Sequence, residues 1–138
     1  MTHKQKINHD LPHHGVFTRI RPSKIHGIGI FAIVNIKKGT YIFPGNDNPM
    51  VWINKSDLLN LSPEIMKLYD DFCVIKNNGT LYGCPKNFNM LTIGWYLNHS
   101  ETPNVGCDIE KGYEFFALRD IKRDEELTVD YRTFTERP

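Results

Sequence analysis

Short apolar segments alternate with short polar segments along this chain, and this pattern predicts strands more often than helices. Segments of four to seven residues, rich in β-branched and aromatic side chains, recur between glycine, proline and asparagine. This punctuation is typical of a mainly β domain. The expected strands lie at residues 16–21, 29–34, 40–43, 72–75, 80–83, 113–119 and 126–129.

Turn and cap residues separate these strands. Gly39 and Asp124 occupy equivalent places in two similar turns, where we expect a left-handed backbone. The run Asn77-Asn78-Gly79 predicts a hairpin turn. Ser62-Pro63-Glu64 predicts a helix that starts with Ser62 as N-cap and runs to about residue 69. Residues 87–97 are a second candidate for a short helix.

Length and composition favour one globular domain. With 138 residues, the chain is expected to form an N-terminal arm at 1–15 and a single domain at 16–138. No apolar run approaches the roughly 20 residues of a membrane span, and the polar N-terminus lacks a signal peptide's apolar core. An odd number of cysteines without a C-x-x-C pair disfavours disulfides and zinc, so we expect a cytoplasmic or other intracellular protein. These cysteines are Cys73, Cys84 and Cys107.

Charge is distributed unevenly. Residues 1–40 carry seven Lys/Arg against one acid, and residues 41–138 carry ten against fifteen. Either this is a basic arm on an ordinary solvated surface, or the acidic body attracts a basic peptide. The basic residues are not interleaved with an aromatic platform, so direct nucleic-acid binding is not expected. The N-terminal histidines lack helical spacing, and no metal site is predicted.

Three motifs carry the candidate chemistry. They are KIHGIGIFA at 24–32, NHSETPN at 98–104 and ALRDIKRDEELTVDY at 117–131. Separately they are a glycine turn, a polar turn and a hairpin. Together, and in this order, they resemble the SET-domain family of protein lysine methyltransferases, in which H-G-x-G-x-F-A, N-H-S-C-x-P-N and R-D-I-x-x-G-E-E-L-T-x-D-Y follow one another. The resemblance spans residues 17–131.

The resemblance implies a β-clip-like fold of small curved antiparallel sheets, with the closing segment threaded beneath a loop as a pseudoknot. It also implies S-adenosyl-L-methionine as the cofactor and a lysine of a basic protein or peptide as the substrate. The oligomeric state stays open, with a homodimer among the alternatives. The implied cofactor-binding residues are His26, Gly27, Ile28, Gly29, Asn98 and His99.

Methyl transfer to lysine is an in-line displacement, so alignment and delivery of a neutral amine decide its rate. Free lysine is protonated at neutral pH, with a pKa of about 10.4. An apolar channel and a neighbouring sulfonium both lower that pKa, by desolvation and by charge repulsion. The resemblance assigns the catalytic tyrosine to Tyr131.

Departures from the family pattern qualify the expected site. Glu101 replaces the usual cysteine, and the FPGND run at 43–47 lacks the tyrosine of E-Y-x-G-E, so Tyr96 or Phe72 is expected to supply that channel wall. Only RTFTERP follows Tyr131, so Phe134 is either a minimal lid that packs on the adenine or a loose tail residue. These departures keep a non-catalytic, SET-like peptide-binding domain as the alternative function.

Product specificity depends on positions close to the amine. Family members often carry Phe or Tyr two residues before the terminal tyrosine, where this chain has Val129. A second limiting tyrosine of some members corresponds to Cys107. We therefore expect a roomy pocket and products beyond monomethyl-lysine.

Overall fold

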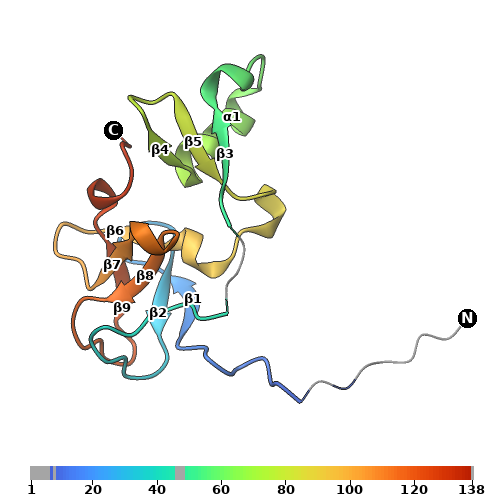
Figure 1. Ribbon diagram of the computed structural model, residues 1–138. Helices are drawn as coiled ribbons and strands as arrows, with labels where there is room; N and C mark the ends of the chain where they lie inside the picture. The colour runs from blue at the N-terminus through green and yellow to red at the C-terminus, as the bar shows by residue number, and fades with distance from the viewer. Residues whose placement is uncertain (1–6, 8, 46–48, 138) are drawn as a thin grey trace, which may run out of the picture.

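Two β-sheets of unequal size form the structure, a computed structural model that describes residues 7, 9–45 and 49–137 (Figure 1). The larger sheet has the order β1-β2-β9-β7-β8, with β6 alongside β9. Its strands are β1 (Thr18–Pro22), β2 (Ile28–Ala32), β6 (Asn98–His99), β7 (Val105–Asp108), β8 (Glu114–Ala117) and β9 (Glu126–Val129). The mainly β fold class is thereby confirmed.

The smaller sheet is an insertion between β2 and β6, and it lies above the larger sheet in Figure 1. Its order is β3-β5-β4, with β3 at Val51–Asn54, β4 at Val74–Lys76 and β5 at Leu81–Cys84. The one α-helix of the described residues, α1 (Pro63–Phe72), belongs to this insertion. Ser62 caps it as expected, because its hydroxyl accepts the Ile65 N–H at 3.3 Å.

The last strand, β9, lies inside the larger sheet. It pairs antiparallel with β2 through Ile30 and Leu127. On its other side it pairs in parallel with β6, where Asn98 faces Thr128, and with β7, where Val105 faces Val129. The closing segment thus inserts between strands that precede it in the chain, as a pseudoknot requires, and brings Tyr131 next to the 97–99 segment.

Each sheet has its own hydrophobic core. The larger core is built on β-branched and leucine side chains that are no more than 1% exposed, among them Ile30, Val105 and Leu127. Full burial of one such side chain contributes about 1.5–3 kcal/mol. The smaller core contains Cys73, Tyr82 and their neighbours.

The predicted turns are confirmed. Gly39 and Asp124 have φ of 86° and 74°, and the two turns they close are joined by a bridge between Ile36 and Ile121. Asn77 and Asn78 both have positive φ, as a tight hairpin turn between β4 and β5 requires.

Two predicted elements differ in the structure. Residues 40–43 form a single bridge, Tyr41 to Phe116, because Pro44 follows at once and prevents a longer ladder. Residues 87–97 form two short 3₁₀ turns, Phe88–Met90 and Ile93–Tyr96, in place of a helix. Leu91 and Thr92 between these turns are extended.

Strands β3, β6 and β7 were not predicted. β3 and β7 have four residues each and β6 has two, so their sequence patterns are too short to indicate strands.

The C-terminal segment bridges the two sheets, and Figure 1 shows it rising beside β4. The Thr135 hydroxyl accepts the Ile75 N–H at 2.9 Å, and the Glu136 N–H donates to the Ile75 carbonyl at 2.9 Å. The tail therefore occupies part of the outer edge of β4. Among the described residues, none of the helices has the length and apolar character needed to cross a membrane.

The predicted arm at 1–15 lies partly outside the described residues. Its described part contains a turn in which the His14 N–H donates to the Leu11 carbonyl. Of the 43–47 run, Asn46 and Asp47 also lie outside the described residues.

Candidate active site

The side chain of Asn98 connects the start of β2 to β9. It is 7% exposed, and its amide nitrogen lies 3.2 Å from the His26 carbonyl and 3.0 Å from the Ile28 carbonyl. The same nitrogen lies 2.8 Å from a carboxylate oxygen of Glu126 and 3.1 Å from the Ser23 hydroxyl. Asn98 therefore fixes the backbone of the glycine segment through contacts to its carbonyl groups.

Ser23 and Glu126 complete this network. The Ser23 hydroxyl donates to the Glu126 carboxylate, with its oxygen 2.7 and 2.9 Å from the two carboxylate oxygens. It also accepts the Ile25 N–H at 2.9 Å, and the Ser23 N–H donates to the Gly27 carbonyl. The sequence assigned neither residue a role in the site, although Glu126 belongs to the 117–131 motif and Ser23 directly precedes the 24–32 motif. Their side chains converge only because β9 is placed beside β2.

The two glycines have different functions in the backbone. Gly29 is buried, and a Cβ there would lie 2.8 Å from the Glu126 Cδ and 3.1 Å from the Asn98 amide nitrogen. Only glycine permits this close approach. Gly27 has a φ of 48°, and a Cβ there would meet nothing within 4 Å. The backbone around Gly27 is thus exposed and free of side chains on that side.

His99 and Tyr131 lie together where β6 and β9 end. The His99 Nδ1 accepts the Tyr131 N–H at 3.0 Å, and their ring centroids are 5.2 Å apart. The Tyr131 hydroxyl donates to the Leu97 carbonyl at 2.5 Å. Burial raises the pKa of this phenol above its ordinary value of 10.0, so the hydroxyl stays protonated at neutral pH.

A cavity of about 420 Å³ lies beside Tyr131, between the larger sheet and the insertion. Its wall is largely aromatic and apolar, with Phe43, Phe72, Leu97, Phe115, Val129 and Phe134 among the lining residues. Phe134 contacts the rings of Phe115 and Tyr131, with centroids 5.8 and 6.1 Å away. Val129 is 1% exposed and presents a small side chain to this space. Tyr131, Val129 and Phe134, each predicted separately as a site residue, thus line the same cavity.

Arg137 also lines the cavity, and no sequence motif indicated it. Its guanidinium lies over the Tyr131 ring, 5.3 Å from the centroid, and donates to the Cys73 carbonyl at 3.2 and 3.4 Å. Burial lowers the pKa of this group from its ordinary value, yet a guanidinium keeps its charge at any physiological pH. The C-terminal tail therefore brings a positive charge to the cavity wall.

Several predicted residues lie elsewhere. Tyr96 packs on Phe72, with ring centroids 5.5 Å apart, and only Phe72 of the two is among the described residues that line the cavity. Cys107 lies on β7 opposite Phe115 and is likewise not among the lining residues. Burial, reinforced by Asp108, raises the Cys107 pKa to about 12, so it is a neutral thiol.

The predicted cofactor segment and the cavity meet at residues 97–99. Leu97 lines the cavity, whereas the Asn98 side chain reaches towards His26 and Ile28, which do not line it. A ligand with amino, carboxylate and purine groups is bound in a concave site by a few polar groups, among them backbone N–H and C=O groups. The exposed stretch from His26 to Ile28, with Gly27 free of side-chain atoms, offers such backbone groups to S-adenosylmethionine.

Comparisons with known proteins agree with this geometry. The SET domain family matches residues 27–132, which is more than half of the chain. Histone-lysine N-methyltransferases described as specific for histone H3 lysine 4, from Emericella nidulans and Aspergillus oryzae, are 49% identical over 45 residues. That match covers 29% of this chain and 4% of either relative, so the chain spans a small fraction of those proteins.

A crystal structure provides a comparison of folds. A candidate histone methyltransferase of Plasmodium falciparum aligns with a TM-score of 0.55 and 23% identity, over 84% of this chain and 93% of that one. At this identity the likeness concerns the fold alone. The extent of the family match nevertheless decides the classification: this chain belongs to the SET domain family.

Proposed function

We propose that this protein is an S-adenosylmethionine-dependent protein lysine N-methyltransferase. The observation that carries the proposal is the position of the Tyr131 hydroxyl, hydrogen-bonded to the Leu97 carbonyl at one end of a largely apolar cavity. In this proposal His26–Gly29, Asn98 and His99 hold the cofactor, and Tyr131 shapes the methyl-transfer site. When bound, the cofactor supplies an electrophilic methyl group on a sulfonium.

Tyr131 and Leu97 orient the reacting groups. The phenol is fixed through its hydroxyl, through the His99 contact to its backbone and through the Phe134 ring. The Tyr131 hydroxyl oxygen and the Leu97 carbonyl oxygen lie side by side. Their lone pairs accept weak C–H···O contacts from a polarised methyl group. Positioning of this kind contributes much of the rate in a displacement that lacks acid–base chemistry at the transferred methyl carbon.

The cavity wall favours the neutral form of the substrate amine. Aromatic and aliphatic side chains desolvate an ammonium that enters, and the Arg137 guanidinium repels it. Both effects lower the lysine pKa from about 10.4, so the amine loses its proton to water before transfer.

The test combines cofactor binding with methyl transfer. Calorimetry with S-adenosylmethionine measures binding, and radiolabelled cofactor with cell extracts or a basic peptide measures transfer. Tyr131→Phe removes one hydroxyl, and we expect it to bind cofactor normally and lose at least 100-fold in turnover, within the range for a positioned polar group.

Tyr82→Phe is the matched control. Tyr82 is buried and its hydroxyl donates to Asp70 in the insertion, away from the cavity, so turnover should survive that change. Wild-type turnover in Tyr131→Phe would remove Tyr131 from the mechanism. Absence of cofactor binding in the wild type would favour the alternative, a non-catalytic peptide-binding domain.

A further inference from the structure

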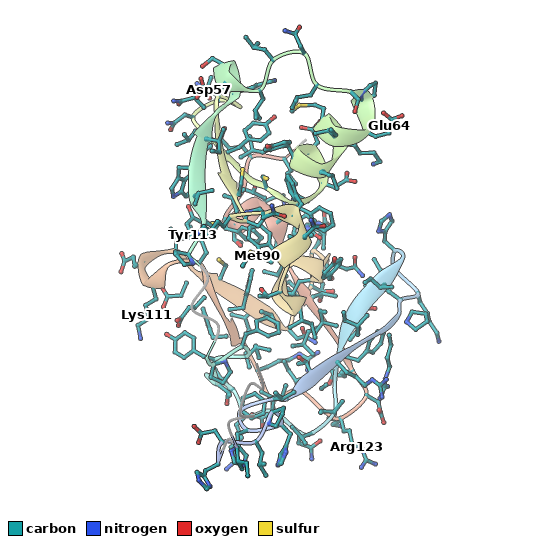
Figure 2. All side chains as sticks on the ribbon, turned by 90° about the vertical axis from the view of Figure 1, so that its right-hand side faces the viewer. Asp57, Glu64, Met90, Lys111, Tyr113 and Arg123 are labelled. Carbon is teal, nitrogen blue, oxygen red and sulfur yellow. The ribbon has the colours of Figure 1, made fainter. Side chains whose placement is uncertain are left out.

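A partly exposed aromatic pair joins the insertion to the larger sheet. Trp52 on β3 is 43% exposed, and its ring lies 6.0 Å from that of Tyr113, with the planes tilted by 53°. Figure 2 shows Tyr113 where the β7–β8 hairpin reaches the end of β3, with Lys111 further out on the same hairpin. Tryptophan and tyrosine are enriched at binding surfaces, where one part of the ring is buried and another is in water.

The backbone holds both rings in place. Gly112 and Tyr113 have successive positive φ values of 71° and 64°, and a bulky aromatic residue rarely adopts that conformation. On the other side, a Cβ on Gly83 would lie 2.8 Å from the Trp52 ring, so the indole rests on the glycine backbone. The backbone of Tyr113 is strained, and Gly83 leaves the space that the Trp52 ring fills. Strain kept at such a position points to a functional geometry.

The pair lies at the rim of the cavity beside Tyr131. Tyr113, Glu114 and Met50 line the cavity, whereas Trp52 packs on Tyr113 from outside. A substrate lysine that enters the cavity past Tyr113 and Glu114 brings its neighbouring side chains close to Trp52.

The rim favours positive charge. The hairpin from 108 to 114 carries three carboxylates, on Asp108, Glu110 and Glu114, against the single ammonium of Lys111. Lys111 already lies over the ring of Tyr41 at 4.9 Å from the centroid. No cation–π contact to Trp52 or Tyr113 occurs within the described part of the chain.

We propose that Trp52, Tyr113 and Glu114 form a cation seat for a second basic side chain of the substrate, an arginine or lysine that flanks the lysine entering the cavity. The inference rests on the proposed function for the identity of the entering lysine. The indole face attracts the cation, and Glu114 pairs with it at the rim. The proposed substrate is therefore a lysine that has an arginine or a second lysine close to it in the sequence.

Synthetic peptides test the seat. Each peptide has nine residues, with a lysine at the centre and glycine or serine at the other positions. In one series a single arginine replaces each of these other positions in turn, and in the second series a single glutamine does so. Fluorescence anisotropy measures the dissociation constant of each labelled peptide without cofactor, and mass spectrometry then measures methylation with S-adenosylmethionine. We expect arginine to bind about fivefold more tightly than glutamine at one or two positions, as one exposed cation–π contact provides.

Variants identify the residues responsible. Trp52→Ala should bring the arginine-to-glutamine ratio close to one, Trp52→Phe should keep part of it, and Glu114→Gln should reduce the ratio less than Trp52→Ala does and weaken its salt dependence. Val51→Ala is the matched control, since Val51 precedes Trp52 on β3 and is 36% exposed. If Trp52→Ala unfolds, Trp52→Leu keeps an apolar contact with Gly83 and removes the aromatic face.

The outcomes separate the two proposals. A ratio near one at every position, or an unchanged ratio in folded Trp52→Ala and Trp52→Leu, overturns the seat. An arginine preference that depends on Trp52, without any methyl transfer, supports the seat and counts against the methyltransferase assignment.

Discussion

Replacing Asn98 tests whether one amide organises the cofactor segment. Its nitrogen lies within 3.2 Å of four oxygens, yet it has only two N–H groups. The two shortest contacts, to Glu126 at 2.8 Å and to the Ile28 carbonyl at 3.0 Å, are therefore the bonds that Asn98→Ala removes.

The magnitude follows from those two bonds. A hydrogen bond to a charged group contributes about 1.5–3 kcal/mol and a neutral one about 1 kcal/mol, so Asn98→Ala should lower the free energy of unfolding by about 3 kcal/mol. Asn98→Asp keeps the shape but places a carboxylate against the Glu126 carboxylate. At neutral pH it should destabilise the protein more than alanine does.

The pH dependence gives the sign of this effect. The carboxylate of Glu126 raises the pKa of the introduced carboxyl in the folded protein above its value in the unfolded chain. The folded state then binds the proton more tightly, and the stability of Asn98→Asp recovers as the pH falls through that raised pKa. Asn98→Ala has no such carboxyl and should show no comparable recovery.

Urea unfolding at pH 7 and pH 5, with calorimetry of S-adenosylmethionine binding at pH 7, measures both effects. Asn104→Ala is the matched control. Asn104 is 3% exposed and bonds to the backbone of β9, with 2.8 Å to the Glu126 carbonyl and 2.8 Å from the Thr128 N–H. It should lose stability while the folded fraction binds cofactor normally.

Two results would refute the reasoning. One is equal stability of Asn98→Asp and Asn98→Ala at pH 7, which would mean that the contact to Glu126 carries no energy. The other is unchanged cofactor affinity in folded Asn98→Ala, which would separate the network from the proposed cofactor site.

The remaining predictions concern the products, the acid limb of stability and the C-terminal tail. Mass spectrometry should find di- or trimethyl-lysine among the wild-type products and fewer methyl groups with Val129→Tyr, because the larger ring fills space at the cavity wall; strict monomethylation by the wild type would contradict this. Arg119, with smaller contributions from the Lys122 N–H and Asn104, lowers the Glu125 pKa from 4.5 to about 2. The stability this provides is present above pH 4.5 and lost as the pH falls towards 2, so acid titration of unfolding should show a shallower loss for Glu125→Gln. Thr135→Val leaves the buried Ile75 N–H without its acceptor and should cost about 1–3 kcal/mol in urea unfolding, whereas the exposed Thr133→Val should cost less.

The sequence by itself determined the features that depend on residues close together in the chain, namely turns, the helix start and the motifs. Asn77-Asn78-Gly79, Gly39 and Asp124 occupy turns because few other residues accept their backbone angles. Ser62 starts α1 because its hydroxyl reaches an N–H three residues later. The three motifs likewise predicted the SET family, since their identities and order are written in the chain itself.

Only the tertiary structure decided which distant groups meet. Parallel pairing of β6 with β9 joins residues 30 positions apart and brings Asn98 close to Glu126, whereas the antiparallel pairing of β2 with β9 brings Ser23 to Glu126. Residues 87–97 have enough apolar positions for a helix. Gly94, however, packs closely against the Phe43 ring, and the segment forms 3₁₀ turns around this contact. Arg137 reaches the cavity because the tail bonds to the edge of β4. Such contacts depend on the relative placement of two sheets, which no local pattern of residues encodes.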